Sequence, residues 1–548
     1  MNILGINAVF HDSSAALSVG GRIVAASEEE RFNRRKHAKN CMPFTAWELP
    51  VQAAAWCLQY AGLKPQDVDV IAYSYDPSLA TSVSDDVMEN DWEALRTLYA
   101  KRAPHFLRAA LPGIERAAFE FVPHHIAHAA SAYLAAPLGD CAVIVADGRG
   151  ERGSYVAGKV RDGRLNILAS QELPHSLGLL YEELTVHLGF HRSSDEYKVM
   201  GLAGYGKPKF LDALRSAVRV LPGGGFAVDP LDFCEFAPAR AADGPFSGAH
   251  ADLAASVQTR LEEVLLELAQ WLAQRTGDRV LTMAGGVALN CVANARLARE
   301  GPFERIWVQP AAGDAGTALG AAMFAAHKHG ERVVPMTTAA LGREWDDAEL
   351  GRRLNVANVQ HETPDDIALE VARILAQDGV VGWFQGRSEF GPRALGHRSL
   401  FANPKFAQNL ERLNNIKGRE QFRPVAPMVL ADRAPEIFEG QLPSPYMLFT
   451  HRVKPQWREA IAAAVHVDGT ARVQTVDERE EPLVARMLRE FERLTGIPVV
   501  INTSFNTAGR PMVDEPRDAL ECFGSTPLDA LAIGPYLLRR AGVLAHAV

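Results

Sequence analysis

Short apolar runs separated by turn residues open the chain and predict a three-stranded β-meander. These runs are residues 3–9, 15–19 and 23–26, and Gly20-Gly21 lies between the last two. Two adjacent glycines between apolar runs favour a tight hairpin turn, because glycine adopts the positive φ angles that such turns require. The first part of the chain is therefore expected to be antiparallel β-structure.

The same pattern returns after a stretch of helical periodicity. Three further apolar runs, with Asp162-Gly163 as a turn signal, lie at residues 141–146, 153–160 and 165–170. A glycine-rich strand-to-turn unit follows at 280–290, and it precedes a predicted strand at 306–308 and a predicted helix at 315–326. Strands that alternate with helices predict an α/β fold. The repetition is compatible with two related halves that face a cleft.

The pattern changes between residues 333 and 346, where the chain becomes irregular. A new predicted helix at 365–377 and a new predicted strand at 380–384 follow. We therefore predict a first domain at 1–345 and a second at 355–548. Histidine and aspartate carry the candidate chemistry of the first domain, whereas the second concentrates arginine, lysine, asparagine and glycine. This contrast predicts two domains with two chemical tasks.

Length and composition define the class of protein. A chain of 548 residues is too long for one hydrophobic core, and ~150 residues per domain suggests roughly three or four structural units. With 47% hydrophobic and 22% charged residues, the composition is that of a globular protein, which excludes a disordered chain or a coiled coil. A formal net charge of −9 provides no basic surface for a phosphate backbone, so nucleic acid is not an expected partner.

Targeting signals and cysteines bear on the cellular location. The N-terminal sequence has no basic flank before an apolar core, and no apolar run approaches the ~18 residues that a membrane span requires. The cysteines are Cys41, Cys57, Cys141, Cys234, Cys291 and Cys522. They form no Cys-x-x-Cys pair, which disfavours a zinc ribbon and a disulfide framework. We expect a cytoplasmic protein with reduced, mostly buried cysteines and no membrane partner.

Two histidines four residues apart form the first part of a candidate metal site. On a helix, His124 and His128 would lie on one face at a spacing that suits a single ion, whereas His125 would point about 100° away. Asp147 ends an apolar strand and Asp314 precedes a predicted helix, so both carboxylates are expected to point into a cleft. A chance histidine pair, an Asp-Gly turn and a helix cap are the structural alternatives. Two imidazoles and two carboxylates suit Fe(II), Mn(II) or Zn(II), and we favour Fe(II).

Two glycine-rich stretches are candidates for binding a nucleotide or a phosphate. One follows a predicted strand and opens a helix, so Gly285, Gly286 and Asn290 would let a phosphate or an adenosine approach the backbone closely. A tight strand-to-helix packing turn explains the same sequence equally well. The other begins at Lys198 and is flanked by lysines, which suits a phosphate, with a flexible surface loop as the alternative.

Seven motifs spread along the chain are specific when they occur together. They are Phe-His-Asp-Ser-Ser-Ala-Ala (10–16), Glu-Glu-Glu-Arg-Phe (28–32), His-His-Ile-Ala-His-Ala-Ala-Ser (124–131), Lys-Val-Met-Gly-Leu-Ala (198–203), Ala-Gly-Gly-Val-Ala-Leu-Asn (284–290), Gly-Pro-Arg-Ala-Leu-Gly-His-Arg-Ser (391–399) and Asn-Thr-Ser-Phe-Asn (502–506). With them, nearly the whole chain resembles the O-carbamoyltransferases of nodulation-factor, tobramycin, novobiocin and cephamycin biosynthesis. The resemblance implies an actin/hexokinase-like first domain, with two ribonuclease H-type halves, joined to a YrdC-like α/β domain.

The resemblance also implies a reaction and its binding residues. The enzyme would be a transferase of one-carbon groups that makes carbamoyl adenylate from carbamoyl phosphate and ATP, with Mg2+, and the four candidate ligands would hold its metal ion. The second domain would bind ATP and carbamoyl phosphate through Arg387, Arg393, Arg398, Ser399, Lys417, Arg419, Arg423, Asn502 and Ser504. Forked guanidinium groups match phosphate oxygens, and Arg398 would act in catalysis by neutralising developing charge. A surface salt bridge is the alternative for any one of these arginines.

In the second step of the implied reaction, a hydroxyl attacks the carbamoyl carbon and AMP leaves. A metal ion would stabilise the developing charge. His11 is the first candidate for the general base and His37 the second, because imidazole titrates near neutral pH; either could instead be structural or bind the adenylate phosphate. The acceptor would be a small molecule bearing a sugar, aminocyclitol, cephem or polyketide hydroxyl, and a homodimer stays open.

Three other functions share parts of this pattern. A threonylcarbamoyl transferase that modifies tRNA has a related metal domain, but the fused second domain and the acidic chain argue against it. Hydrogenase-maturation carbamoyltransferases carry zinc-binding Cys-x-x-Cys repeats, which this sequence lacks. A catalytically silent nucleotide-binding protein would not need the histidine, aspartate and arginine sets.

Overall fold

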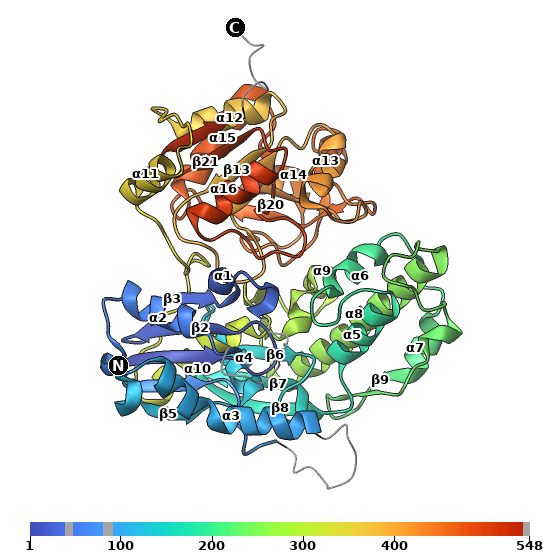
Figure 1. The fold of residues 1–548 in the computed structure, drawn as a ribbon. Helices are drawn as coiled ribbons and strands as arrows, with labels where there is room; N and C mark the ends of the chain where they lie inside the picture. The colour runs from blue at the N-terminus through green and yellow to red at the C-terminus, as the bar shows by residue number, and fades with distance from the viewer. Residues whose placement is uncertain (39–47, 81–90, 541–548) are drawn as a thin grey trace. The chain divides into compact units, whose positions relative to one another are not determined.

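The computed structural model describes residues 1–38, 48–80 and 91–540, and the chain divides into two compact units (Figure 1). The first unit is Met1–Thr337 and the second is Thr338–Val548. The division between the units falls inside the irregular segment at residues 333–346.

The first unit begins with the expected meander, which is part of a five-stranded sheet of order β3-β2-β1-β4-β5. The strands are β1 (Asn2–Asn7), β2 (Ser14–Val19), β3 (Arg22–Glu28), β4 (Val70–Tyr73) and β5 (Ala118–Phe121). The first three strands pair antiparallel, β4 joins β1 in parallel, and β5 joins β4 in parallel. Gly20 and Gly21 both have positive φ angles, 56° and 77°, which confirms the predicted turn.

A second sheet repeats this topology with the order β12-β11-β6-β7-β8. Its strands are β6 (Cys141–Ala146), β7 (Gly153–Arg161), β8 (Arg164–Glu172), β11 (Val280–Ala284) and β12 (Arg305–Val308). Again three strands form an antiparallel meander and two further strands continue the sheet in parallel from the first strand of the meander. The shared strand order confirms the predicted α/β fold with the repeated halves of an actin/hexokinase-like domain.

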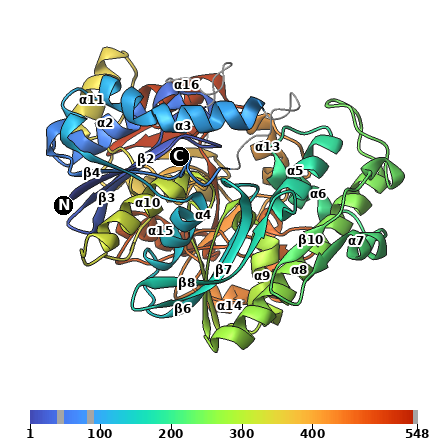
Figure 2. The same cartoon turned by 90° about the horizontal axis from the view of Figure 1, so that it is seen from below.

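Two helices rich in small residues connect the halves of the first unit. Helix α10 (Ala315–Lys328) packs on β1 and β2, helix α4 (His124–Tyr133) packs on β6 and β11, and the two helices lie side by side (Figures 1 and 2). A Cβ on Gly320 of α10 would lie 1.9 Å from the carbonyl oxygen of Ala127 in α4, so only glycine permits this approach. The close packing fixes the start of α4 relative to the start of α10, and both starts carry predicted metal ligands.

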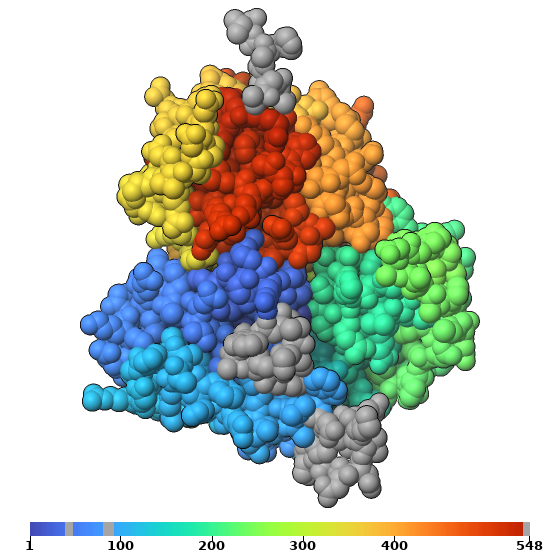
Figure 3. Space-filling model, viewed as in Figure 1, coloured from blue at the N-terminus to red at the C-terminus, as the bar shows by residue number. Residues whose placement is uncertain are grey.

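The remaining elements of the first unit surround these two layers. The helices are α1 (Glu30–Asn33), α2 (Val51–Tyr60), α3 (Asp91–Ala110), α5 (Leu177–His187), α6 (Glu196–Ala203), α7 (Leu211–Ala217), α8 (Gly248–Thr276) and α9 (Cys291–Glu300). A two-stranded ribbon consists of β9 (Val218–Val220) and β10 (Phe226–Val228). Exposed charged pairs such as Arg219 with Asp229 place α7 and this ribbon at the surface, in the green part of Figure 3.

The second unit contains a seven-stranded mixed sheet of order β19-β15-β20-β14-β13-β21-β22. Its strands are β13 (Val381–Phe384), β14 (Arg398–Ala402), β15 (Ala426–Leu430), β19 (Gln474–Val476), β20 (Val499–Ser504), β21 (Ala530–Ile533) and β22 (Tyr536–Arg539). Helices α12 (Ile367–Ala376) and α15 (Pro482–Thr495) pack on each other and share a core with Trp383 and Phe401. The predicted helix at 365–377 and strand at 380–384 are thereby confirmed.

Smaller elements complete the second unit. They are α11 (Asp347–Val356), α13 (Gln408–Lys417), α14 (Ala434–Ile437), α16 (Pro516–Ser525) and a three-stranded sheet of β16 (Phe438–Glu439), β17 (His451–Val453) and β18 (Thr470–Ala471). Across residues 1–38, 48–80 and 91–540, no helix has both the length and the apolar character needed to span a membrane. Four cysteines are buried free thiols and Cys234 is an exposed one, whereas Cys41 lies outside the described residues.

Candidate metal centre and its surroundings

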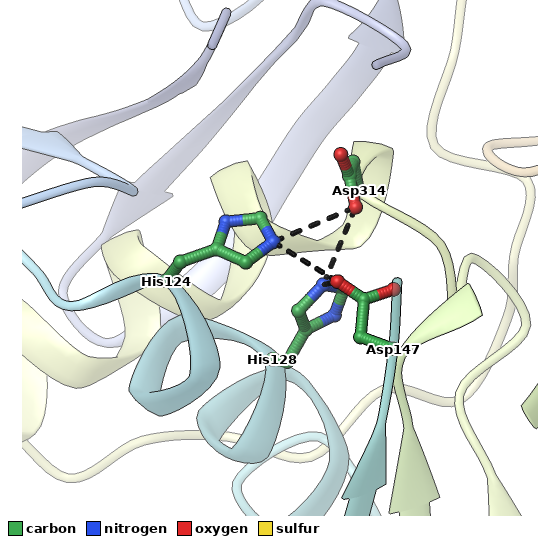
Figure 4. Close-up of side chains that lie close together, drawn as sticks. All are labelled: His124, His128, Asp147 and Asp314. Atoms are coloured by element: carbon green, nitrogen blue, oxygen red, sulfur yellow. Dashed lines mark ion pairs between the residues drawn. The ribbon is translucent and has the colours of Figure 1, made fainter. Parts of the chain in front are cut away.

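The four predicted metal ligands lie together in the first unit (Figure 4). His124 and His128 come from α4. Asp147 follows β6, and Asp314 immediately precedes α10. All four side chains are buried, and one ligand atom from each lies within 4.8 Å of the others. The repeated halves thus contribute to one site, since α4 packs on the second sheet and α10 on the first.

The spacing of the ligand atoms suits a metal ion. Nε2 of His124 lies 3.4 Å from Oδ2 of Asp147 and 3.6 Å from Oδ1 of Asp314. Nε2 of His128 lies 3.6 Å and 3.4 Å from the same two oxygens. Bonds of ~2.1 Å around a tetrahedral ion separate the ligand atoms by roughly 3.4 Å. Neither Nε2 has a hydrogen-bond partner within the described part of the chain, so these residues fit a divalent ion.

Neighbouring groups orient two of the ligands. Nδ1 of His124 lies 3.2 Å from the carbonyl oxygen of Ser74, so a proton on Nδ1 leaves Nε2 as the basic nitrogen. The backbone amide of His124 donates a 2.9 Å hydrogen bond to Glu151, whose carboxylate caps the start of α4. The backbone amide of Gly286 donates a 2.9 Å hydrogen bond to Oδ1 of Asp147, which leaves Oδ2 directed at the histidines.

Burial and charge shift the pKa values in opposite directions within the cluster. Burial lowers the pKa of His124 and of His128, but the carboxylates of Asp147 and Asp314 outweigh it and raise both. Burial raises the pKa of the two aspartates, yet the histidines hold both below the usual range. For His125, burial and the charge of His124 outweigh the effect of the two carboxylates and lower its pKa to about 3. His125 is therefore neutral beside the cluster, and its Nε2 is 3.9 Å from Oδ2 of Asp147.

A second cluster joins the two candidate bases through one carboxylate. Nδ1 of His11 lies 2.9 Å from Oδ2 of Asp12, and Nδ1 of His37 lies 2.8 Å from Oδ1 of the same residue. The imidazole rings are 4.1 Å apart between centroids. On its other side, Nε2 of His37 lies 2.8 Å from the hydroxyl oxygen of Ser194. The structure therefore brings both predicted bases into one hydrogen-bonded group.

The predicted nucleotide residues of the first unit make local structural contacts. Gly285 has a φ of 92°, and a Cβ there would lie 2.2 Å from the backbone of β6. Asn290 caps α9 by accepting a hydrogen bond from the backbone amide of Ala293. Lys198 forms an ion pair of 3.1 Å with Asp195. Close packing against β6 therefore explains why the sequence has a glycine at 285. Nucleotide binding by Gly285, Asn290 and Lys198 stays a prediction.

In the second unit, neighbouring strands gather several of the predicted polar residues. Ser399 of β14 lies opposite Ser504 of β20. Nζ of Lys417, at the end of α13, donates to the Ser504 hydroxyl at 3.0 Å and to Oδ1 of Asn506 at 2.6 Å. Asn502, two residues before Ser504 on β20, extends this polar group along the strand. These contacts place a lysine beside several hydroxyl and amide groups.

The predicted arginines differ in their surroundings. The Arg398 side chain is fully buried, stacks on Phe384 at 3.8 Å, and donates to backbone carbonyls. These carbonyls belong to Arg343, Gln385, Gly386 and His397. Arg387 donates to the carbonyl of Gly342 at 3.1 Å, and Arg393 is partly exposed in the loop before β14. Arg419 and Arg423 lie in the loop after α13. Whether these side chains bind ATP or carbamoyl phosphate stays a prediction.

Four polar residues of the sites were not predicted from the sequence. Asp12 stands between the two candidate bases, and Ser194 contacts one of them. Glu151 caps the helix that carries the two candidate metal-binding histidines. Glu389 is buried and accepts hydrogen bonds from three backbone amides, two in the loop before β14 and one at the first residue of that strand. Of these four residues, only Asp12 could have been suspected from the sequence, because it directly follows His11 in the motif at residues 10–16.

Comparisons with known proteins cover nearly the whole chain. The family model described as "Carbamoyltransferase N-terminus" matches residues 2–323, and "Carbamoyltransferase C-terminus" matches residues 372–540. An uncharacterized protein of Synechocystis is 37% identical over 98% of this chain and 97% of its own length. Nodulation protein NolNO of Sinorhizobium fredii is 36% identical over 97% of this chain and 80% of its own length. Nodulation protein U of Rhizobium tropici is 31% identical over 95% of this chain and 93% of its own length.

Solved structures give weaker matches. HypF of T. kodakarensis is 15% identical with a TM-score of 0.34, over 60% of this chain and 48% of its own. A ROK hexokinase of Thermus thermophilus is 15% identical with a TM-score of 0.28, over 59% of this chain and 98% of its own. Both TM-scores are below 0.5, whereas the repeated strand order of the two sheets is a direct feature of the first unit.

Proposed function

This chain belongs to the carbamoyltransferase family, and on that premise we propose that it transfers a carbamoyl group from carbamoyl adenylate to a hydroxyl of a small molecule. The adenylate would come from ATP and carbamoyl phosphate. With one water consumed, that step yields carbamoyl adenylate, pyrophosphate and phosphate. In the second step the hydroxyl oxygen bonds to the carbamoyl carbon, the carbon–phosphate oxygen bond breaks, and AMP leaves.

The observation that carries the proposal is the buried cluster of His124, His128, Asp147 and Asp314. The Nε2 atoms of its two histidines face the carboxylates at spacings of 3.4 to 3.6 Å, and neither atom has a hydrogen-bond partner among the residues that the structure describes. Buried ionisable groups need a partner charge or a bound metal ion, and Nε2 atoms that face the carboxylates beyond hydrogen-bond distance favour an ion between them. We propose Fe(II) as the ion, with Mn(II) or Zn(II) as substitutes. Bound there, a divalent ion supplies Lewis-acid stabilisation of the charge that develops on oxygen.

The residues around the cluster keep its ligands ready to bind. Ser74 and Glu151 fix His124 by its side chain and its backbone, respectively. Gly286 holds one oxygen of Asp147. Full burial excludes water from the imidazoles, and this strengthens electrostatic interactions in the site. The protein's contribution to the second step would thus be a dry, preorganised set of ligands and a nearby base.

We propose that the second unit forms the adenylate in a YrdC-like domain. The polar group of Lys417, Ser399 and Ser504 and the arginines of the loops before β14 and after α13 support this assignment. Lysine and arginine side chains neutralise phosphate oxygens, as the substrates ATP with Mg2+ and carbamoyl phosphate require. The acceptor would be a sugar or another natural product with a free hydroxyl.

A two-product assay tests the proposed function. Purified protein is supplied with ATP, carbamoyl phosphate, Mg2+ and Fe(II), and pyrophosphate and AMP are measured with and without a panel of sugars and aminocyclitols. We expect pyrophosphate to depend on carbamoyl phosphate, and AMP to rise when a suitable hydroxyl is present. A wild-type protein that releases neither product with any acceptor would exclude the proposal.

The metal assignment has its own pair of variants. His128→Ala removes one ligand and should abolish most AMP release. His105→Gln changes an exposed histidine of α3 and should behave as the wild type. Full carbamoyl transfer by His128→Ala would remove the cluster from the mechanism while leaving the adenylate chemistry intact.

A further inference from the structure

Ser74, the residue that follows strand β4, contacts both elements that start with a candidate metal ligand. Its carbonyl oxygen lies 3.2 Å from Nδ1 of His124, and its hydroxyl oxygen lies 2.8 Å from Oγ1 of Thr317. Thr317 is in the first turn of α10, and its hydroxyl donates a 2.7 Å hydrogen bond to the carbonyl oxygen of Asp314. A hydrogen-bonded bridge therefore runs from Asp314 to His124 through two hydroxyl-bearing residues.

We propose that Ser74 and Thr317 are positioning residues of the metal centre: their bridge holds His124 and Asp314 in the arrangement that binds the ion, although neither residue is a ligand. This inference rests on the proposed function, because it takes the buried cluster as the metal site. It goes beyond that function, since it assigns a role to two hydroxyl groups outside the cluster. Groups that hydrogen-bond to metal ligands fix the orientation of those ligands and thereby raise metal affinity.

The proton positions along the bridge follow from what each group can donate. Thr317 has one hydroxyl proton, and the carbonyl oxygen of Asp314 can only accept, so this proton goes to Asp314. The 2.8 Å contact between the two hydroxyls then uses the proton of Ser74. The carbonyl oxygen of Ser74 also can only accept, so it favours a proton on Nδ1 of His124. In the neutral imidazole, Nε2 is then the nitrogen that is free to bind a metal ion.

Burial makes the bridge difficult to replace. The side chains of Thr317 and His124 are fully buried, and Ser74 is nearly so. Water therefore cannot substitute for a lost partner in the bridge. The backbone amide of Ser74 donates a 3.0 Å hydrogen bond to the carbonyl oxygen of Ile6, which ties Ser74 to β1 as well. The bridge is thus anchored in the first sheet and reaches a ligand on α4, which packs on the second sheet.

The other histidine of the cluster has no comparable support. Within residues 1–38, 48–80 and 91–540, neither ring nitrogen of His128 has a hydrogen-bond partner. His124, one turn earlier on α4, has its Nδ1 held by Ser74. Only one of the two candidate imidazole ligands is therefore oriented by its side chain before a metal binds. This difference predicts that metal affinity depends on the bridge to His124.

The substitution Thr317→Val breaks the bridge at nearly constant shape. The carbonyl oxygen of Asp314 keeps the 2.9 Å hydrogen bond from the backbone amide of residue 317. The hydroxyl of Ser74 can turn toward Oδ1 of Asn7, which lies 3.4 Å away. Because no buried donor is left unsatisfied, the variant should fold. Thr317→Ser restores the hydroxyl and serves as the rescue.

The test measures metal binding directly in the full-length protein. Metal-stripped protein is titrated with Co(II) in competition with a chelator of known affinity, and the Co(II) absorption spectrum reports the ligand geometry. We expect Thr317→Val to weaken Co(II) binding by roughly 10- to 100-fold and Ser74→Ala to weaken it in the same direction. The double variant should lose no more than the larger single loss, since both substitutions remove the same hydrogen bond. Thr317→Ser should bind Co(II) as the wild type does.

Thr185→Val is the matched control for the loss of a buried hydroxyl. Thr185 is fully buried in α5 of the same unit, and its hydroxyl donates a 2.8 Å hydrogen bond to the carbonyl oxygen of Tyr181. Urea denaturation should show a lower unfolding free energy for this variant, but its affinity for Co(II) should equal that of the wild type. A loss of Co(II) affinity in Thr185→Val equal to that in Thr317→Val would overturn the inference.

The variant His128→Ala separates a failure of this inference from a failure of the proposed function. Co(II) binding that is lost in His128→Ala but unchanged in Thr317→Val would remove the bridge from the metal centre and leave the site itself intact. Co(II) binding by His128→Ala with the affinity of the wild type would place the ion elsewhere, and the metal assignment of the proposed function would fall with the inference.

Discussion

The backbone amide of Gly286 holds the carboxylate of Asp147 by a 2.9 Å hydrogen bond. The glycine-rich turn after β11 therefore orients a proposed metal ligand that follows β6, and the two strands are parallel neighbours. The hydrogen bond gives the turn a structural role at the proposed metal site, and this role does not require a bound nucleotide.

Substitution in this turn should affect stability and metal binding together. A Cβ on Gly285 would lie 2.2 Å from the carbonyl oxygen of Ala146, and the φ of 92° disfavours any side chain. We expect Gly285→Ala to lower the free energy of unfolding by about 2–4 kcal/mol and to reduce metal content. Gly277→Ala is the matched control, since Gly277 has a φ of 69° but open space around its Cβ position. If urea denaturation showed the same loss of unfolding free energy for both variants, a steric clash of the new Cβ with Ala146 would not be its cause.

Metal content should follow the ligand set. The His128→Ala and Asp314→Asn variants each remove one ligand, and elemental analysis after purification should find most of the ion lost from both. His125→Gln should keep the ion, because the Nε2 of His125 lies outside the cluster. Retention of the metal by both ligand variants would show that it binds elsewhere.

The stability of the second unit should depend on pH through His397. Burial lowers the pKa of His397, but Glu481, 3.1 Å away, and Glu389 raise it above the usual value. The stabilisation by the charged imidazole is complete below the unfolded pKa of about 6.5 and is lost as pH rises through the folded value. The wild type should therefore exceed His397→Gln in unfolding free energy most at about pH 6, and the difference should shrink by about pH 9. A difference that grows with pH would contradict this assignment.

The Arg398 side chain should stabilise the backbone of the neighbouring loops, in addition to any role in catalysis. Its guanidinium donates to the carbonyl of Gln385 at 2.8 Å and of Arg343 at 2.9 Å. Lysine keeps the charge but lacks the fork, so we expect Arg398→Lys to cost about 3 kcal/mol of unfolding free energy and to reduce pyrophosphate formation. Arg352→Lys, at an exposed pair with Glu349, should cost less than about 0.5 kcal/mol. Wild-type stability of Arg398→Lys with loss of activity would indicate a purely chemical role.

Local patterns predicted much of the fold. The run 141–146 became β6 with the same bounds, and the predicted helix at 315–326 became α10. The pairing of His124 with His128 could be predicted because a spacing of four residues brings two side chains to one face of a helix. Their aspartates were found because each ends or begins a regular element.

The sequence could not predict contacts that depend on unusual backbone or on distant segments. Asp12 serves two histidines only because both it and His37 adopt positive φ angles. Ser194 and His37 are 157 positions apart in the sequence, and a local sequence pattern cannot predict a contact between such distant residues. The buried surroundings of Arg398 were equally hidden, since an arginine beside glycines is typical of a phosphate site and of a loop anchor alike.

The most direct test of metal-dependent carbamoyl transfer is a metal titration of the second half-reaction. Metal-stripped protein is supplied with ATP, carbamoyl phosphate and a hydroxyl acceptor, and AMP release is measured as Fe(II) is added. We predict that AMP release rises with bound metal and saturates when a single ion is bound per chain, while His128→Ala stays low throughout. Full AMP release from the metal-free wild type would contradict the account.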